Sequence, residues 1–371
     1  MPDFALLTAG DPAPLFHLPS PTTPRFTFGS VAGRYLVLAF FHDGTAPQAV
    51  AAQAALLSRP DLFDDDFASF FGISSHPDDV VRLLNRPPGY RYLFDTARDV
   101  GRLYGAVASQ GEDSRGMWVV IDPTFRVIDA FAFEDVPDGG AGRVVSLLET
   151  LPPPVRFSGQ ELQAPILYLP RVFEPDLCRR LIAHYDAQGG EMSGVMRQIG
   201  GRTTLVHDPA HKVRRDVLLS EPEMLATIHS RILHKIVPEI AKVHQFRVTR
   251  MERYLVACYD SADGAHFRPH RDNTTAGTAH RRFAVSINLN DDFDGGEVSF
   301  PEYGPRGFKA APGGAVVFSC SLLHAVSEVT RGARYAFLPF LYDEAAARLR
   351  EHNRRHETAG AEPATPSEPA A

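Results

Sequence analysis

The sequence predicts two domains, an α/β domain followed by a mainly β domain, and three observations carry this prediction. The chain has 371 residues, which is more than one ordinary compact domain contains. Residues 1–150 alternate short apolar runs with helix-like runs. From residue 252 onward, many short strand-like runs are separated by turns that contain glycine and proline.

The α/β prediction for residues 1–150 rests on the order of the segments. Apolar runs that predict strands occupy 34–41, 67–75, 116–123 and 127–133. Runs that predict helices occupy 46–58, 77–85 and 142–151. Alternation of this kind predicts a central sheet covered by helices.

Composition also marks the domain boundaries. Residues 151–165, LPPPVRFSGQELQAP, contain three consecutive prolines and no amphipathic period, which predicts a linker. We therefore expect the first domain at 1–150 and the second at 166–345. The segment 346–371 ends in a stretch rich in Ala, Pro and Glu, and we expect it to be largely disordered.

Charge and cysteine content exclude several classes of protein. A net charge of −7 with 44% hydrophobic residues disfavours nucleic acid or an anionic membrane as the main partner. Cys178, Cys258 and Cys320 lie far apart, so neither a disulfide framework nor a thiolate zinc site is expected. The N-terminus lacks the pattern of a signal peptide, and the apolar run 35–41 is too short to span a membrane. We expect a cytoplasmic protein.

Three segments of the first domain resemble the peroxiredoxin branch of the thioredoxin fold. They are GDPAPLFHLPS, FDDDFASFFGISSHPDD and SRGMWVVIDPTFRVID. The resemblance implies a thioredoxin-like domain. It fails at the chemistry, because the peroxidatic cysteine expected near FFHDGTAPQAV is absent and Arg115, which stands where the family keeps an activating arginine, has no thiolate to activate. We expect a scaffold or partner-binding module without thiol peroxidase activity; the alternative is a retained small-ligand pocket.

His-x-Asp triplets occur three times in the sequence, so the triplet alone indicates little. His76 and Asp78 fall in a predicted loop, and His184 and Asp186 fall on a predicted helix, where residues two apart point to different sides. His270 and Asp272 instead lie in a predicted strand, AHFRPHRD, where residues two apart share a face and can meet one cation.

A third ligand for such a cation follows from the later strands, which predict an antiparallel barrel or sandwich. His324 comes 52 residues after Asp272 (324 − 272), behind the strand-like run GAVVFSCSLL. Two histidines and one carboxylate on one side of a metal form the facial triad of non-heme Fe(II) oxygenases. Arg334, ten residues further on (334 − 324), has the side chain needed to hold a carboxylate by two parallel hydrogen bonds.

Residues 163–343 resemble the 2-oxoglutarate/Fe(II)-dependent dioxygenases, specifically the prolyl 4-hydroxylase-like branch. The matching stretches are ACYDSADGAHFRPHRDN, INLNDDFDGGEVSF and APGGAVVFSCSLLHAVSEVTRGARYAF. The resemblance implies a double-stranded β-helix, or jelly-roll, fold with His270, Asp272 and His324 as catalytic metal ligands. It further implies that Arg334 holds the C5 carboxylate of 2-oxoglutarate and that Tyr259 lines the cosubstrate pocket.

The implied chemistry is decarboxylation of 2-oxoglutarate to succinate, coupled to C–H hydroxylation of a substrate. It requires Fe(II), 2-oxoglutarate and dioxygen, with ascorbate as an optional supporting reductant. Family halogenases replace the ligand carboxylate with a small residue, whereas Asp272 is present here, so hydroxylation is expected. The alternative is a non-catalytic protein that recruits a partner or senses 2-oxoglutarate or iron.

Substrate identity stays open at this point, because similarity of fold does not fix a substrate. A protein side chain, a free amino acid and a small metabolite are all compatible with the sequence. The segment 190–216, rich in Gly and basic residues, is expected to form a lid over the site. Arg281 and Arg282 are expected to be solvated, with contact to cosubstrate or substrate as the alternative, and Gly295 and Gly296 to serve a turn.

Overall fold

The computed structural model describes residues 3–5 and 7–359, and the chain divides into two units. Unit 1 comprises the chain up to Ala164 together with Pro301–Pro305, and unit 2 comprises Pro165–Phe300 and the chain from Arg306 onward. The sequence predicts one break near 151–165, so the grouping of 301–305 with unit 1 is a difference. In the part of the chain that the structure describes, no helix is both long and apolar enough to cross a membrane.

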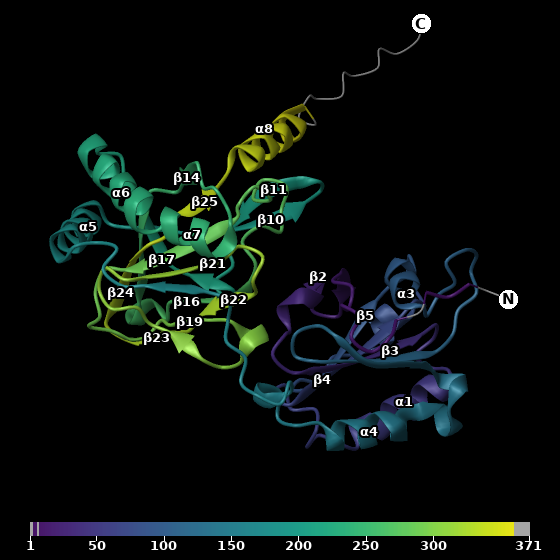
Figure 1. The fold of residues 1–371 in the computed structure, drawn as a ribbon. Coiled ribbons are helices and arrows are strands. Elements are labelled where there is room, and N and C mark those ends of the chain that lie inside the picture. The colour runs from purple at the N-terminus through teal and green to yellow at the C-terminus, as the bar shows by residue number, and fades with distance from the viewer. Residues whose placement is uncertain (1–2, 6, 360–371) are drawn as a thin grey trace, which may run out of the picture. The chain divides into compact units, whose positions relative to one another are not determined.

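Unit 1 is built on a mixed five-stranded sheet, as the alternation of segments predicts (Figure 1). Its strands, in the order in which they lie side by side, are β5 (Tyr90–Phe94), β4 (Ala68–Ser74), β3 (Tyr35–Phe41), β6 (Met117–Ile121) and β7 (Val127–Ala132). The first three are parallel to one another. β6 is antiparallel to β3, and β7 is antiparallel to β6. A separate hairpin consists of β1 (His17–Ser20) and β2 (Thr23–Thr27). Every residue of β3 and β4 is buried, as expected for strands covered on both faces.

The helices of unit 1 are α1 (Pro47–Leu57), α2 (Asp79–Arg82), α3 (Asp99–Tyr104) and α4 (Ala141–Thr150). Leu56 of α1 and Leu148 of α4 belong to the same core cluster as Val37 of β3, so these two helices cover one face of the sheet (Figure 1). The predicted helix at 77–85 was wrong in length. Helix α2 is short because Asp79 is its one buried residue and two prolines follow soon after it.

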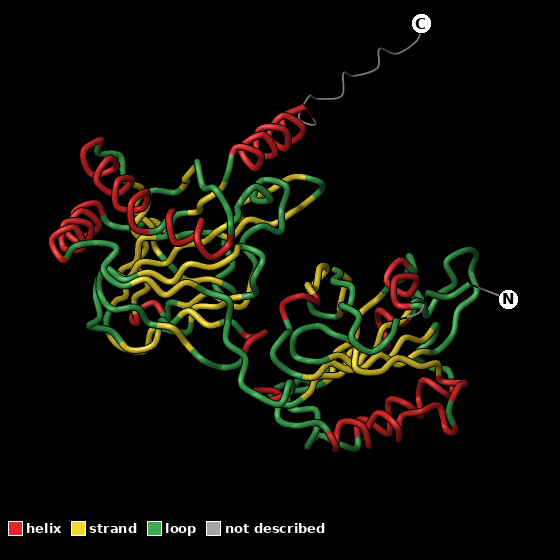
Figure 2. The backbone as a smooth tube through the Cα atoms, viewed as in Figure 1, coloured by secondary structure: helices red, strands yellow, loops and turns green. Residues whose placement is uncertain are grey.

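Unit 2 contains two antiparallel sheets of unequal size (Figures 1 and 2). The larger contains β8 (Leu167–Leu169), β9 (Glu191–Met192), β13 (Arg215–Leu218), β14 (Arg250–Glu252), β15 (Leu255–Asp260), β17 (Phe283–Asn288), β21 (Ala315–Ser319), β24 (Ala333–Phe337) and β25 (Phe340–Tyr342). The smaller contains β12 (Lys212–Val213), β16 (His266–His270), β22 (His324–Val326), β19 (Val298–Ser299) and β20 (Gly307–Phe308). Two-stranded pairs are β10 (Val195–Ile199) with β11 (Arg202–Val206) and β18 (Asp294–Gly295) with β23 (Val329–Arg331).

Three helices of unit 2 cover one face of the larger sheet. They are α5 (Pro175–Gln188), α6 (Pro222–Lys235) and α7 (Val237–His244). Alternate residues of the strands, such as Val256 in β15, Val285 in β17 and Phe337 in β24, join the core beneath these helices. Because side chains alternate along a strand, the residues between them face the other way. This opposite face holds Tyr259, Arg334 and their polar neighbours.

Three expectations for unit 2 need correction. The predicted strand ERYLVACYD is broken, because Arg253 has a positive φ of 65° and separates β14 from β15. The expected lid at 190–216 is only partly separate from the core, since β12 and β13 pair with core strands and only the hairpin β10–β11 stands apart from the two larger sheets.

The expected disorder of 346–371 was wrong for its first part, because helix α8 spans Glu344–Ala359 (Figure 1). Arg350 and Asn353 attach this helix to the rest of unit 2: Arg350 pairs with Glu252 at 3.1 Å, and Asn353 donates to the carbonyl of Ala276 at 2.7 Å. Residues 360–371 lie outside the described part of the chain.

Candidate metal centre

The smaller sheet places the two predicted histidine ligands opposite each other on neighbouring strands. His270 ends β16 and is the direct cross-strand partner of His324 at the start of β22. Asp272 lies just beyond the end of β16, where its backbone N–H donates to the carbonyl of Cys320 at 3.0 Å. His270 therefore lies in a strand as predicted, whereas Asp272 lies in the turn that follows it.

The three side chains converge on one point. An Asp272 carboxylate oxygen lies 3.6 Å from His270 Nε2 and the other lies 3.3 Å from His324 Nε2. One potential ligand atom from each residue lies within 4.8 Å of the other two, and no other such group of His, Cys, Asp or Glu is found among the described residues. His76 instead accepts from the backbone of Asp78, and His184 pairs with Glu221.

Hydrogen bonds to the far side of each imidazole set its orientation. Nδ1 of His270 lies 2.8 Å from the carbonyl of Arg268, and Nδ1 of His324 lies 3.1 Å from the carbonyl of Leu322. Because a carbonyl can only accept, Nδ1 carries the proton and Nε2 directs its lone pair toward the centre shared with Asp272, where a cation would bind.

The electrostatics of the centre also suit a metal ion. Burial, followed by the charge of His324, lowers the pKa of His270 to about 4, so its imidazole is neutral at pH 7. Burial raises the pKa of Asp272, but His324 and His270 outweigh it and leave that pKa below its ordinary range. Two imidazoles and one carboxylate are the donor set of a 2-His-1-carboxylate Fe(II) site.

Arg334, in β24, lies on the larger sheet with an unusual set of partners. The side chain is buried, with 1% exposure. Its Nε donates to Asn288 Oδ1 at 2.9 Å and its Nη2 to Ser286 Oγ at 2.7 Å. Nη1 is buried without a hydrogen-bond partner. Since a buried unpaired donor is costly, this atom fits the carboxylate of a ligand. The Nε edge of the guanidinium is already occupied, so the end that carries Nη1 is left for that ligand.

Tyr259, in β15, is the cross-strand neighbour of Arg334. It is 1% exposed, and the Arg334 guanidinium lies over its ring at 5.3 Å from the centroid. Its hydroxyl lies 3.4 Å from Nη1 of Arg214. The structure thus brings Tyr259 and Arg334 together on one sheet and His270, Asp272 and His324 together on the other.

Three residues that lie against Arg334 were not predicted from the sequence to do so. Ser286 and Asn288 were missed, although two polar residues at a spacing of two within the apolar strand FAVSIN were a usable signal. Gly296 was assigned only a turn. A Cβ at this position would lie 3.0 Å from Cδ of Arg334 and 3.0 Å from a methyl of Val329. Glycine is therefore needed here so that the Arg334 side chain can pass.

The two arginines of the RRF stretch differ in their surroundings. Arg281 donates from Nε to Glu252 at 2.8 Å, and its Nη1 lies 3.5 Å from the carbonyl of Asp272. It is therefore close behind a proposed ligand and is largely buried, against the expectation of a solvated charge. Arg282 donates to the carbonyl of Ala279.

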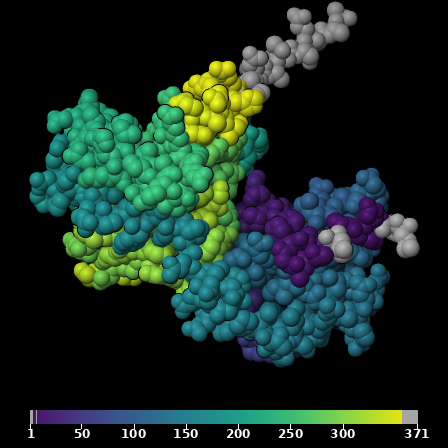
Figure 3. All heavy atoms as spheres, in the orientation of Figure 1, coloured from purple at the N-terminus to yellow at the C-terminus, as the bar shows by residue number. Residues whose placement is uncertain are grey.

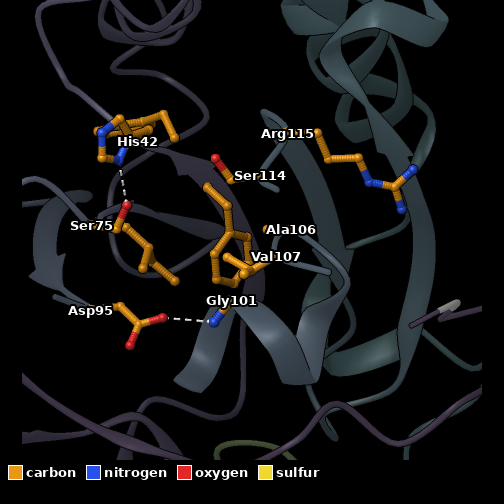
Figure 4. Close-up of a pocket in the computed structure, with 11 residues that line it drawn as sticks. His42, Ser75, Asp95, Gly101, Ala106, Val107, Ser114 and Arg115 are labelled. Atoms are coloured by element: carbon orange, nitrogen blue, oxygen red, sulfur yellow. Dashed lines mark hydrogen bonds between the residues drawn. The ribbon is translucent and has the colours of Figure 1, made fainter. Parts of the chain in front are cut away.

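Unit 1 has a separate pocket at the carboxyl ends of its parallel strands (Figure 4). Nδ1 of His42 lies 2.9 Å from Ser75 Oγ, and Asp95 accepts from the backbone of Gly101 at 2.6 Å. Arg115 lines the pocket but donates to the carbonyl of Gly105 and packs over the ring of Phe4. No cysteine is among the lining residues. The pocket therefore contains no thiol that Arg115 would activate.

A comparison with family models decides the affiliation of unit 2. Residues 254–342, which contain the His-Asp-His centre and Arg334, match the model described as the 2OG-Fe(II) oxygenase superfamily. This region belongs to that superfamily. The resemblance to this family that was expected from sequence is thereby confirmed for this region, and the family name carries both Fe(II) and 2-oxoglutarate.

Individual relatives of the oxygenase region agree in type. A PKHD-type hydroxylase of Maricaulis maris is 32% identical over 132 residues, which are 34% of this chain and 58% of that protein. The chain spans about half the length of the curated relatives that it matches.

Solved structures resemble each unit separately. A prolyl-4-hydroxylase of Pseudomonas putida matches 49% of this chain and 94% of its own, with a TM-score of 0.37 and 19% identity. The peroxidoxin BcpB of Mycobacterium tuberculosis matches 40% of this chain and 99% of its own, with a TM-score of 0.35 and 18% identity.

Proposed function

We propose that the protein is a 2-oxoglutarate- and Fe(II)-dependent dioxygenase that hydroxylates a C–H bond of a substrate, in the manner of the prolyl 4-hydroxylase-like enzymes. The observation that carries the proposal is the combination of a convergent His270–Asp272–His324 centre with a buried arginine whose Nη1 has no partner. In fold terms, we propose that unit 2 is a double-stranded β-helix and unit 1 a thioredoxin-like domain.

Each residue has a defined task in this proposal. His270, Asp272 and His324 would hold Fe(II). Iron bound there would supply the oxidative decarboxylation of 2-oxoglutarate by dioxygen to succinate and carbon dioxide and the coupled hydroxylation, with ascorbate as a supporting reductant. Arg334 binds the C5 carboxylate through Nη1, and Tyr259 forms the adjacent wall of the cosubstrate site.

Burial controls what reaches the centre. His270 and Asp272 each keep 13% exposure of their side chains and His324 keeps 7%, so the centre is shielded but not sealed. Arg334 and Tyr259 are almost completely buried. A cosubstrate bound there is desolvated at its C5 end, and this strengthens its interaction with the guanidinium.

Formation of succinate from 2-oxoglutarate by the purified protein with Fe(II), ascorbate and oxygen tests the proposal. The expected result is turnover that is lost in His270→Ala and in Arg334→Ala. His76→Ala is the matched control, since it removes a histidine from the same His-x-Asp pattern outside the centre. Turnover that survives both site variants would contradict the proposal, and iron and 2-oxoglutarate binding without turnover would favour the sensor alternative.

A further inference from the structure

A cluster of basic side chains, two of them buried and one partly exposed, lies beside the proposed active site and contains one carboxylate. We define this basic cluster as Lys212, Arg214 and Arg253, together with Asp216. Lys212 is in β12, which pairs with β16, the strand that ends at His270. Asp216 is in β13, which pairs with β15, the strand that carries Tyr259. The cluster therefore adjoins strands of both sheets that contribute to the site.

The single carboxylate of the cluster is already committed. Arg214, 4% exposed, donates from Nε and Nη2 to the two oxygens of Asp216, each at 2.6 Å. Arg253 reaches the same carboxylate only at 3.4 Å. Lys212 donates to Ser193 Oγ at 2.7 Å and to the carbonyl of Gly194 at 2.8 Å, which are neutral acceptors. Three basic side chains thus share one carboxylate: within the cluster Lys212 has no anionic partner, and Arg253 has only its 3.4 Å hydrogen bond to Asp216.

Other nearby charges do not correct this excess. Glu252 is occupied by Arg281 at 2.8 Å, by His280 at 3.0 Å and by Arg350 at 3.1 Å. Asp272 belongs to the proposed metal centre. Fe(II) and the dianion of 2-oxoglutarate would neutralise each other, so their binding leaves the positive excess of the cluster unchanged. Buried charges without partners are costly.

The response of the cations reflects that cost. Burial, followed by the charge of Arg214, lowers the pKa of Lys212 to about 6 and that of Arg253 to about 10, so Lys212 is largely uncharged at pH 7 while no anion is bound. An anion beside either side chain would raise its pKa and return Lys212 to its charged form.

Contacts with two aromatic rings connect Lys212 and Arg253 to the surroundings of the metal centre. The ammonium of Lys212 lies over the ring of Phe267 at 5.0 Å, and the same ring stacks on His270 with centroids 3.5 Å apart. Arg253 is held by a backbone in the left-handed region, which non-glycine residues rarely adopt. Its side chain remains 28% exposed and lies over the ring of Phe340, which Arg281 also contacts. Arg253 is therefore accessible to a bound molecule.

We propose that Lys212 and Arg253 form a subsite for an anionic group of the substrate, a carboxylate or a phosphate, beside the metal centre. The proposal rests on the proposed function, because it places this subsite next to a metal-bound reaction centre. Asp216 and Arg214 act as positioning residues that hold Arg253 and the strand β13. A purely structural cluster, in which Lys212 only fastens the loop at Ser193, would have no affinity for anions.

Proton relaxation of small probe ions near Mn(II) tests the subsite without turnover. The protein is loaded with Mn(II) in place of iron and saturated with 2-oxoglutarate, so that Arg334 is occupied. Sodium acetate, methylphosphonate and tetramethylammonium are then titrated, and relaxation of their methyl protons is measured. We expect saturable enhancement for acetate or methylphosphonate and none for tetramethylammonium, and the preferred anion distinguishes a carboxylate from a phosphate ligand.

Variants locate the effect. Lys212→Gln and Arg253→Gln are each expected to weaken the apparent affinity for the anion by about tenfold or more, as loss of a charged hydrogen bond predicts. Arg215→Gln is the matched control, because Arg215 lies in β13 next to Asp216 of the cluster but pairs with Asp263 at 3.0 Å and is exposed. Arg253 is partly exposed, so its replacement leaves the fold intact.

The outcomes separate the two proposals. A protein that binds Mn(II) and 2-oxoglutarate but enhances the relaxation of neither anion overturns the subsite alone. Enhancement retained in both glutamine variants also overturns it, since the anion would then be bound to the metal. A protein that holds no Mn(II) at all contradicts the proposed function, and the subsite falls with it.

Discussion

Replacement of Asn288 by alanine should raise the KM for 2-oxoglutarate without removing the metal. The substitution deletes the acceptor that lies 2.9 Å from Nε of Arg334, in a place where the arginine is only 1% exposed and water cannot substitute. A hydrogen bond to a charged group contributes about 1.5–3 kcal/mol. At about 1.4 kcal/mol per tenfold, the KM for 2-oxoglutarate should rise about 10- to 100-fold.

Steady-state succinate formation as a function of 2-oxoglutarate concentration measures this effect, with bound iron determined on each sample. Asn290→Ala is the matched control, because Asn290 bonds Asp292, Ala333 and Tyr335 but not Arg334. Asn288→Asp should be worse than alanine, since its negative charge would repel the C5 carboxylate. A KM for Asn288→Ala within about twofold of the unmodified protein, at full iron content, would refute the role of this contact.

Three further predictions concern metal, acid and thiols. Removal of bound metal with EDTA should lower the melting temperature measured by calorimetry. The expected loss of stability is about 2.7 kcal/mol when metal had been present at 100-fold its Kd, and His324→Ala should abolish the difference. Equal melting temperatures with and without EDTA in the unmodified protein would contradict a metal centre. Burial raises the pKa of Glu252, but its bonds with His280 and Arg281 outweigh this and leave it at about 2. The carboxylate therefore stabilises the fold above pH 4.5 and loses that contribution as pH falls toward 2. Glu252→Gln should reduce the fall in the free energy of urea unfolding over this pH range by up to about 3 kcal/mol. An unchanged pH dependence in the variant would contradict this role of Glu252. Burial raises the pKa of Cys178 and Cys258 to about 11 and that of Cys320 well above its usual value, so a thiol reagent should label the protein only on unfolding, and rapid thiol-dependent peroxide consumption without iron would overturn this reasoning.

The sequence carried enough information for the two-unit character and the strands that hold the site. The runs around residues 34–41 and 283–288 are strongly apolar and form β3 and β17. Sequence spacing also singled out the histidines, because His270 and Asp272 lie two apart in a predicted strand and His324 follows a later strand-like run. The direct pairing of His270 with His324 appears only in the structure. These inferences depend on local pattern, which a sequence displays.

Features that depend on contacts between distant residues were not accessible in this way. Alanine, leucine, arginine and glutamate favour the helix α8, but its attachment through Arg350 to Glu252 joins residues about a hundred positions apart in the chain. Arg253 breaks a regular strand pattern without a glycine to announce it. The role of Gly296 likewise appears only when the Arg334 side chain is seen crossing it.

Anaerobic binding of Fe(II) and 2-oxoglutarate tests the proposed iron and cosubstrate sites without any substrate. We expect one Fe(II) per chain, lost when His270, Asp272 or His324 is replaced by alanine. We also expect one 2-oxoglutarate per chain that binds only to the iron-loaded protein and depends on Arg334. Stoichiometric iron binding that survives loss of all three ligands, or 2-oxoglutarate binding that is indifferent to Arg334→Ala, would contradict the proposed function.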